Sequence, residues 1–259
     1  MIILNPQMKN CYPFLLLIFV LSSCGIYRQN VVNVPLIQQK GQLQLGVHHS
    51  FSGPEAQVCY APVKNVALMA NYYNNGSQTT TYVKDINYTI DKRYFGELGI
   101  GLYKKPKGPN GYLSEVFFLV GKGVNSHFWQ GLDSLKTIST EFRQVSYNRF
   151  CVQADLGKSY RKTQFAISPR LFFINYYDIS DPQTDRYAHL ANNYLYFETA
   201  LTMRFTLVRF LVLSAQTCIT VPLTDFNERR YNYYYDFSPF NVSLGLIMNL
   251  ALLKQEKKN

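Results

Sequence analysis

Apolar and polar residues alternate with a period of two through most of this chain, from residue 41 to residue 250. In the stretch 194–205, the apolar side chains of Leu195, Phe197 and Leu201 alternate with polar ones that include Glu198 and Arg204. Successive side chains of a β-strand point to opposite faces, so this period is typical of strands with one apolar and one polar face. The pattern predicts about ten strands, over residues 43–51, 56–60, 66–72, 93–103, 112–122, 149–156, 163–177, 194–205, 211–221 and 240–250.

The connections between these strands are short on one side and mostly long on the other. The short ones are 61–65, 103–111, 157–162 and 207–210, and the long ones are 74–92, 123–145, 178–192 and 222–239. The first hairpin, which also turns on the long-loop side, is the exception because it is short. A tilted strand of about 9–11 residues crosses a bilayer, and bacterial barrels place their short turns in the periplasm. The pattern therefore predicts a transmembrane barrel with long outer loops and both chain ends on the periplasmic side.

A soluble β-sandwich or a lipocalin-like barrel is the alternative, because the same alternation then describes strands with their faces exchanged. Two observations favour the membrane. Many predicted strands are longer than the five or six residues usual in soluble proteins, and the polar face carries charges of both signs at mid-strand. A narrow barrel is largely filled by side chains, and buried ions persist when they are paired. We therefore expect an ion network in the lumen formed by Glu97, Glu115, Arg149, Asp155, Arg170, Glu198 and Arg204.

The N-terminus has the organisation of an export signal. Lys9 precedes an apolar core from Phe14 to Leu21, which is too short to cross a bilayer as a helix. The sequence Leu21-Ser22-Ser23-Cys24 resembles the bacterial lipobox, in which the peptide is cut before the cysteine and the cysteine is acylated. An ordinary signal peptide is the alternative. Cys59, Cys151 and Cys218 remain after cleavage, and their spacing favours buried small side chains over a metal or redox site.

Taken together, the strand rhythm and the loop asymmetry resemble those of the small Gram-negative outer-membrane β-barrel proteins, here in a lipoprotein form. The resemblance covers residues 41–250. It implies a signal peptide over 1–23, a lipidated tether over 24–40, the barrel over 41–250 and a basic periplasmic tail over 251–259. It also implies location in the outer membrane, with the lipid on Cys24 in the inner leaflet.

Charge is sorted between the two sides of the predicted barrel. The long loops have a net charge of −4, whereas the short turns carry +8 and no acid. A basic rim attracts lipid phosphates over about one Debye length, and a purely solvated rim is the alternative. The net charge of +10 does not indicate nucleic-acid binding, because no basic stripe is interleaved with aromatics. The predicted rim consists of Lys64, Lys104, Lys105, Lys107, Lys158, Arg161, Lys162 and Arg209.

Aromatic residues gather near strand ends, where Tyr side chains favour the membrane interface. We assign most of them to an interfacial girdle: Tyr72-Tyr73, Tyr94-Phe95, Tyr176-Tyr177, Tyr194 and Tyr196-Phe197. A denser group in the last long loop could bind a glycan or a partner protein: Tyr231, Tyr233, Tyr234, Tyr235 and Phe237.

No nucleophile, zinc or phosphate-loop motif is present in the sequence. Asp185 and His189 form a conceivable rim pair for a hydrolase, but their spacing in a loop is a weak signal. We therefore expect a non-enzymatic binding or scaffold protein with no cofactor and no metal, which acts through its surface loops and contacts membrane lipids. A narrow solute channel and a rim hydrolase are the alternatives.

Overall fold

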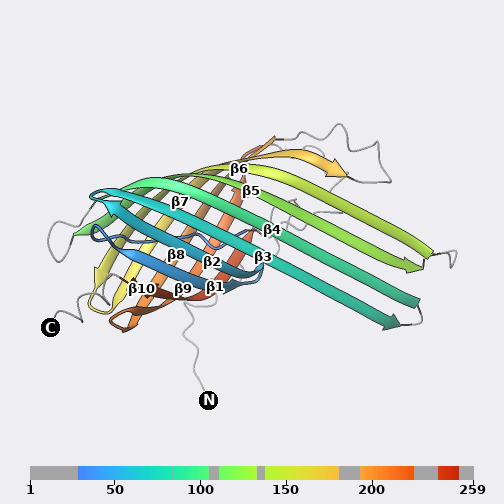
Figure 1. Ribbon diagram of the computed structural model, residues 1–259, viewed down its shortest axis with the longest axis horizontal. Coiled ribbons are helices and arrows are strands. Elements are labelled where there is room, and N and C mark those ends of the chain that lie inside the picture. The colour runs from blue at the N-terminus through green and yellow to red at the C-terminus, as the bar shows by residue number, and fades with distance from the viewer. Residues whose placement is uncertain are drawn as a thin grey trace, which may run out of the picture.

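The chain forms a closed, antiparallel β-barrel of ten strands (Figure 1). The computed structural model describes residues 29–83, 85–104, 111–132, 138–180, 193–224 and 239–250. Each strand pairs with its neighbour in sequence, and β1 pairs with β10 to close the barrel, from Gln44 opposite Asn249 to Ser50 opposite Ser243. The strands are β1 (Leu43–Ser50), β2 (Gly53–Val63), β3 (Val66–Val83), β4 (Asp85–Lys104), β5 (Tyr112–Leu132), β6 (Ile138–Tyr160), β7 (Thr163–Ser180), β8 (Asn193–Val208), β9 (Leu211–Pro222) and β10 (Phe240–Asn249). The predicted fold class and strand number are confirmed.

Two of the predicted long loops, 74–92 and 123–145, are wrong. The β3–β4 ladder continues to the pair Val83 and Asp85, and the β5–β6 ladder continues to the pair Leu132 and Ile138. These four strands extend well beyond the rest of the barrel (Figure 1). Beyond the bilayer a hairpin needs no apolar face, so its alternation fades while its backbone hydrogen bonds persist. The other two long connections lie largely outside the described residues.

The two faces of the barrel differ as the alternation predicts. The outward face of the described strands is apolar, with Leu98 69% exposed and Val47 65% exposed, whereas the neighbouring Glu97 and His48 are 3% exposed. Such a surface is stable in hydrocarbon, because barrel closure leaves no strand edge and satisfies the backbone between strands. No α-helix among the described residues is long and apolar enough to cross a membrane.

Only four of the nine residues assigned to the aromatic girdle are exposed on the outer face, and Tyr194 is half-buried. In each adjacent pair one ring faces outward and the other is buried in the lumen, because neighbouring residues of a strand point to opposite faces. Tyr72, Tyr94, Tyr177 and Phe197 are exposed, whereas Tyr73, Phe95, Tyr176 and Tyr196 are buried.

The predicted tether also requires correction. Its described part is residues 29–40, of which residues 29–37 are all buried and run through the inside of the barrel (Figure 1). This buried stretch forms no ladder with any strand and is buried on all sides, so its sequence lacks the alternation of a strand with one apolar and one polar face. We call residues 29–37 the lumen segment.

Candidate functional site in the barrel lumen

Side chains of the barrel wall bind the backbone of the lumen segment. The Val32 N–H donates to Gln216 Oε1 at 2.8 Å, and Gln216 Nε2 donates back to the Val32 carbonyl at 2.9 Å. At Val31, the N–H donates to Glu55 Oε1 at 2.7 Å, and the carbonyl accepts from Gln57 Nε2 at 3.0 Å. The amide and carboxylate side chains thus replace the strand partner that this extended backbone lacks. Buried backbone groups require such partners, because leaving them unpaired costs free energy comparable to a hydrogen bond.

The second half of the lumen segment is held by Glu115 and Arg204. Glu115 of β5 accepts the Leu36 N–H at 3.0 Å and also the Ile37 N–H. Arg204 of β8 donates to the Pro35 carbonyl at 2.9 Å. These three hydrogen bonds fix the position of the segment near the short-turn end.

Apolar side chains of the lumen segment pack against the barrel wall. Val32, Val34 and Leu36 form a cluster with Leu113, Ala166, Ala200 and Cys218, which come from β5, β7, β8 and β9. A methyl group built on Gly157 would lie 2.5 Å from Leu36 Cδ2. Glycine at 157 therefore provides the space that Leu36 occupies, so the wall is shaped to the side chains of the segment as well as to its backbone.

The lumen segment has a defined direction. At its start, the Gln29 carbonyl accepts from Ser52 in the β1–β2 turn at 2.8 Å and from Asn241 at the beginning of β10 at 3.2 Å. After its end, the Gly41 N–H donates to the Ala61 carbonyl at 2.7 Å, near the end of β2. The segment therefore enters at the long-loop end and emerges at the short-turn end. The expectation that both chain ends lie on the short-turn side is wrong for Gln29, the first described residue.

The structure places all seven residues of the predicted ion network inside the barrel, each at most 4% exposed. It brings four of them together as two ion pairs: Arg149 Nη2 lies 2.6 Å from Glu97 Oε2, and Arg170 pairs with Glu198. The other three bind polar groups instead. Glu115 and Arg204 hold the lumen segment, and Asp155 Oδ1 accepts from Gln153 Nε2 at 3.0 Å.

Both ion pairs connect to the lumen segment through bridging groups. Glu97 accepts from Asn71 at 3.0 Å, and Asn71 accepts from Asn33 at 2.7 Å. On the other side of the lumen, Thr220 donates to Glu198 at 2.6 Å and accepts from Gln29. The network thus supports the segment as well as pairing Arg149 and Arg170 with carboxylates.

Glu55 belongs to this network and was missed in the sequence. It is 3% exposed and binds the Val31 N–H. The alternation could have placed it there. Ala56, Val58 and Tyr60 form the outward apolar face of their strand, and Glu55 is adjacent to Ala56, so it points to the opposite face, the lumen.

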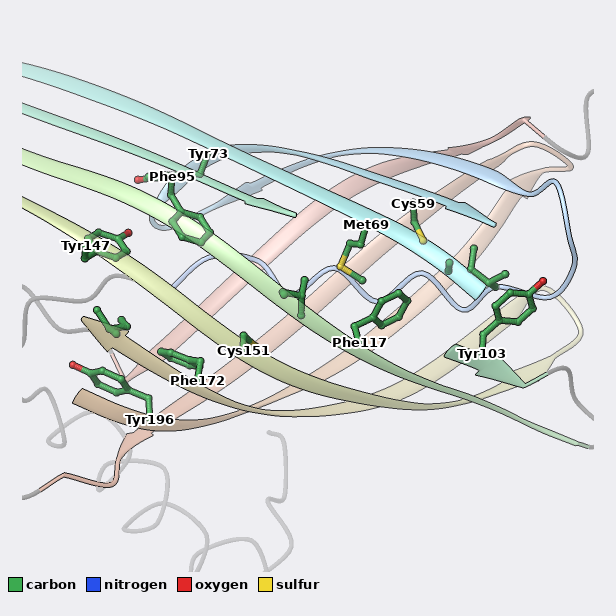
Figure 2. Close-up of a cluster of buried hydrophobic side chains, with 14 of the residues drawn as sticks. Cys59, Met69, Tyr73, Phe95, Tyr103, Phe117, Tyr147, Cys151, Phe172 and Tyr196 are labelled. Atoms are coloured by element: carbon green, nitrogen blue, oxygen red, sulfur yellow. The ribbon is translucent and has the colours of Figure 1, made fainter. Parts of the chain in front are cut away.

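An aromatic wall lines the lumen on the side of β4–β8 (Figure 2). Phe95 stacks on Tyr147 with ring centroids 6.0 Å apart, and Phe172 stacks on Tyr196 at 5.2 Å. The Arg149 guanidinium lies 4.1 Å from the Phe95 ring centroid and 5.5 Å from that of Phe172. A buried cation over aromatic faces gains attraction from their quadrupoles. The wall therefore fixes Arg149 in the orientation in which it meets Glu97.

The structure describes most of the predicted basic rim and three cysteines, whereas several other predicted site residues lie outside the described part of the chain. Lys64, Lys104, Lys158, Arg161, Lys162 and Arg209 are exposed on the short-turn side, whereas Lys105 and Lys107 lie outside the described residues. Cys24, the tyrosine-rich stretch (Tyr231, Tyr233, Tyr234, Tyr235 and Phe237) and the pair Asp185 and His189 also lie outside them. Cys59, Cys151 and Cys218 are free and buried, as predicted. Among the described residues, no group of three or more His, Cys, Asp or Glu side chains could hold a metal ion.

Comparison with known proteins finds similar structures but no matching family. No family model and no curated protein matches the chain. The translocator domain of autotransporter NalP from Neisseria meningitidis is 10% identical, with a TM-score of 0.47, over 80% of this chain and 86% of that one. The outer-membrane protease OmpT from Escherichia coli is 9% identical, with a TM-score of 0.40, over 80% and 91%. The NanC porin is 14% identical, with a TM-score of 0.28, over 80% and 98%. The fold assignment rests on the strand pairing of the chain itself.

Proposed function

We propose that this chain is a non-enzymatic barrel of the Gram-negative outer membrane, plugged by its own N-terminal segment, that acts through the surface of its long-loop end. The occupied lumen is the observation that carries the proposal. The lumen segment binds side chains from β2, β3, β5, β6, β7, β8, β9 and β10. A plug held from so many strands favours a structural role of the lumen over a transport role.

The outward apolar face supports the location, and so does the contrast between the short turns at one end and the extended β3–β4 and β5–β6 hairpins at the other. Residues such as Leu98, Ile100 and Leu102 are more than half exposed along a single strand, where only hydrocarbon would cover them favourably. Closed barrels with short turns on one side are the arrangement of bacterial outer-membrane proteins. A lipid anchor at Cys24 is part of this proposal, and loss of metabolic palmitate labelling in Cys24→Ser would support it. Unchanged labelling would exclude that cysteine.

The plug is tested by planar-bilayer recording of the purified full-length protein. We expect no steady conductance from the wild type. A variant that lacks residues 29–37 should conduct, because removal of the segment leaves the water-filled space between polar walls. The matched control is Leu98→Ile, which changes only the lipid-facing surface and should remain silent. A steady unitary conductance in the wild type would favour the solute channel and overturn the proposal.

The two surface sites are tested separately. Replacing Tyr231, Tyr233, Tyr234, Tyr235 and Phe237 by serine should abolish retention on a glycan array or on a panel of surface proteins if this stretch binds partners. Neutralising Lys64, Arg161 and Lys162 to glutamine should weaken association of the short-turn side with vesicles rich in anionic lipid. Unchanged binding in either experiment would remove the corresponding site from the proposal.

A further inference from the structure

The direction of the lumen segment determines on which side of the membrane the preceding residues lie. Gln29 is bonded to Ser52 in the β1–β2 turn, and Gly41 is bonded to Ala61 at the opposite end. The chain therefore crosses the thickness of the barrel once, inside the lumen, before β1 begins. β1 then crosses back, so Gln29 and Gly53, the first residue of β2, lie at the same end of the barrel.

The distance available to residues before Gln29 is short. Cys24 precedes Gln29 by five positions, and an extended chain spans at most about 3.6 Å per residue, or about 18 Å here. The ten residues of β10 span about 33 Å at the usual strand rise, which is about 23–27 Å of barrel height at the usual strand tilt of about 35–45°. Cys24 thus cannot reach the short-turn end, whether the chain runs inside or outside the barrel.

The rim of the barrel is low beside Gln29. β1 ends at Ser50 and β2 begins at Gly53, whereas β3 continues from Tyr73, which lies opposite Glu55, to Val83. Phe51, in the low turn, is 76% exposed and continues the apolar outer surface of β1. The apolar outer surface of β1 therefore extends to the rim beside Gln29.

We infer that the mature N-terminus passes through the barrel to the long-loop side, so that an acyl anchor on Cys24 lies in the outer leaflet, at the cell surface. This placement replaces the inner-leaflet anchor expected from the sequence. In this arrangement, the segment that joins the lipid anchor to β1 crosses the membrane inside the barrel of the same chain. The inference rests on the same lumen segment as the proposed function, but it concerns sidedness and not conductance.

Labelling of single introduced cysteines in intact cells tests this inference. The variant Tyr27→Cys places a thiol between Cys24 and the lumen segment. Gln130→Cys, on the exposed extension of β5, is the control for the long-loop side, and Lys162→Cys is the control for the short-turn side. Cys59, Cys151 and Cys218 are at most 2% exposed, so they should not react with a membrane-impermeant maleimide in the folded protein.

We expect Tyr27→Cys to be labelled in intact cells to the same extent as Gln130→Cys, while Lys162→Cys is labelled only after the outer membrane is permeabilised. The inference is overturned if Tyr27→Cys is labelled only after permeabilisation, whether or not Gln130→Cys is labelled in intact cells. A silent lumen in bilayer recording together with that result would overturn the sidedness and leave the plugged barrel intact.

Discussion

The outer face and the lumen are built by the same ten strands, yet they differ in what each position requires. Outward residues such as Leu98 and Ile100 meet fluid hydrocarbon, which accepts any apolar side chain. Inward residues meet fixed partners: Glu97 meets Arg149, and Gln216 meets the Val32 backbone. The comparison teaches that the outer face determines where the barrel resides, whereas the lumen determines what it holds. Substitutions at two adjacent residues of one strand therefore compare the lumen with the outer face directly.

The largest difference is expected at positions 97 and 98. Glu97→Ala leaves Arg149 buried without its carboxylate, and breaking a buried ion pair in this way costs about 3–5 kcal/mol. Leu98→Ile keeps the outer face apolar and should cost less than about 1.5 kcal/mol. The measurement is the free energy of unfolding in guanidinium, with refolding into phospholipid vesicles. Equal losses in the two variants would remove the distinction between the faces.

A smaller loss is expected from the plug contacts. Gln216→Leu preserves side-chain volume but leaves the Val32 N–H and carbonyl without partners, at a cost of about 1–3 kcal/mol for a buried polar group. The neighbouring outward substitution Thr217→Val should change the same free energy of unfolding by less than about 0.5 kcal/mol. A Gln216→Leu variant as stable as the wild type would show that the segment does not depend on this bond.

The fit between wall and segment is tested by a double-mutant cycle. Gly157→Ala forces Leu36 to move, and overpacking of this kind costs about 1–2 kcal/mol. In a Leu36→Ala background the same substitution should cost clearly less, because the methyl group then has room. Strictly additive free energies of unfolding would mean that the two residues are not in contact.

The smallest contrast lies at two adjacent tyrosines. The Tyr73 hydroxyl donates to the Ser52 carbonyl inside the barrel, so Tyr73→Phe should lose about 1 kcal/mol of unfolding free energy. Tyr72, one residue away, is 52% exposed on the outer face, and Tyr72→Phe should cost less than half as much. A larger effect at Tyr72 would mean that the interfacial tyrosines matter more than the lumen.

The alternation predicted the parts of the fold that the bilayer enforces. Leu98 and Glu97 were assigned to the correct faces because lipid on one side and a polar lumen on the other impose a strict period of two. The extended β3–β4 hairpin was missed because outside the bilayer only its backbone ladder is constrained. The aromatic pairs were half wrong because composition near a strand end was considered without parity, which places Tyr73 and Phe95 inside.

The lumen segment could not be predicted from local pattern. Val31, Val32, Val34 and Leu36 are too few and too irregularly spaced to indicate a strand or helix. Their burial depends on an enclosure formed by strands far along the chain, and their backbone partners are side chains such as Gln216, 184 residues away. Segments of this kind become recognisable only once the barrel that surrounds them is known.

Hydrogen–deuterium exchange of the folded wild-type protein in detergent micelles measures whether the barrel holds its own N-terminal segment. The N–H groups of Val31, Val32, Leu36 and Ile37 all donate to buried side chains. We therefore predict that a peptide covering residues 29–38 exchanges as slowly as peptides from β9, since both would require opening of the barrel. Exchange as fast as that of a free peptide of the same sequence would show that these residues are an exposed tether and that the barrel is not plugged by them.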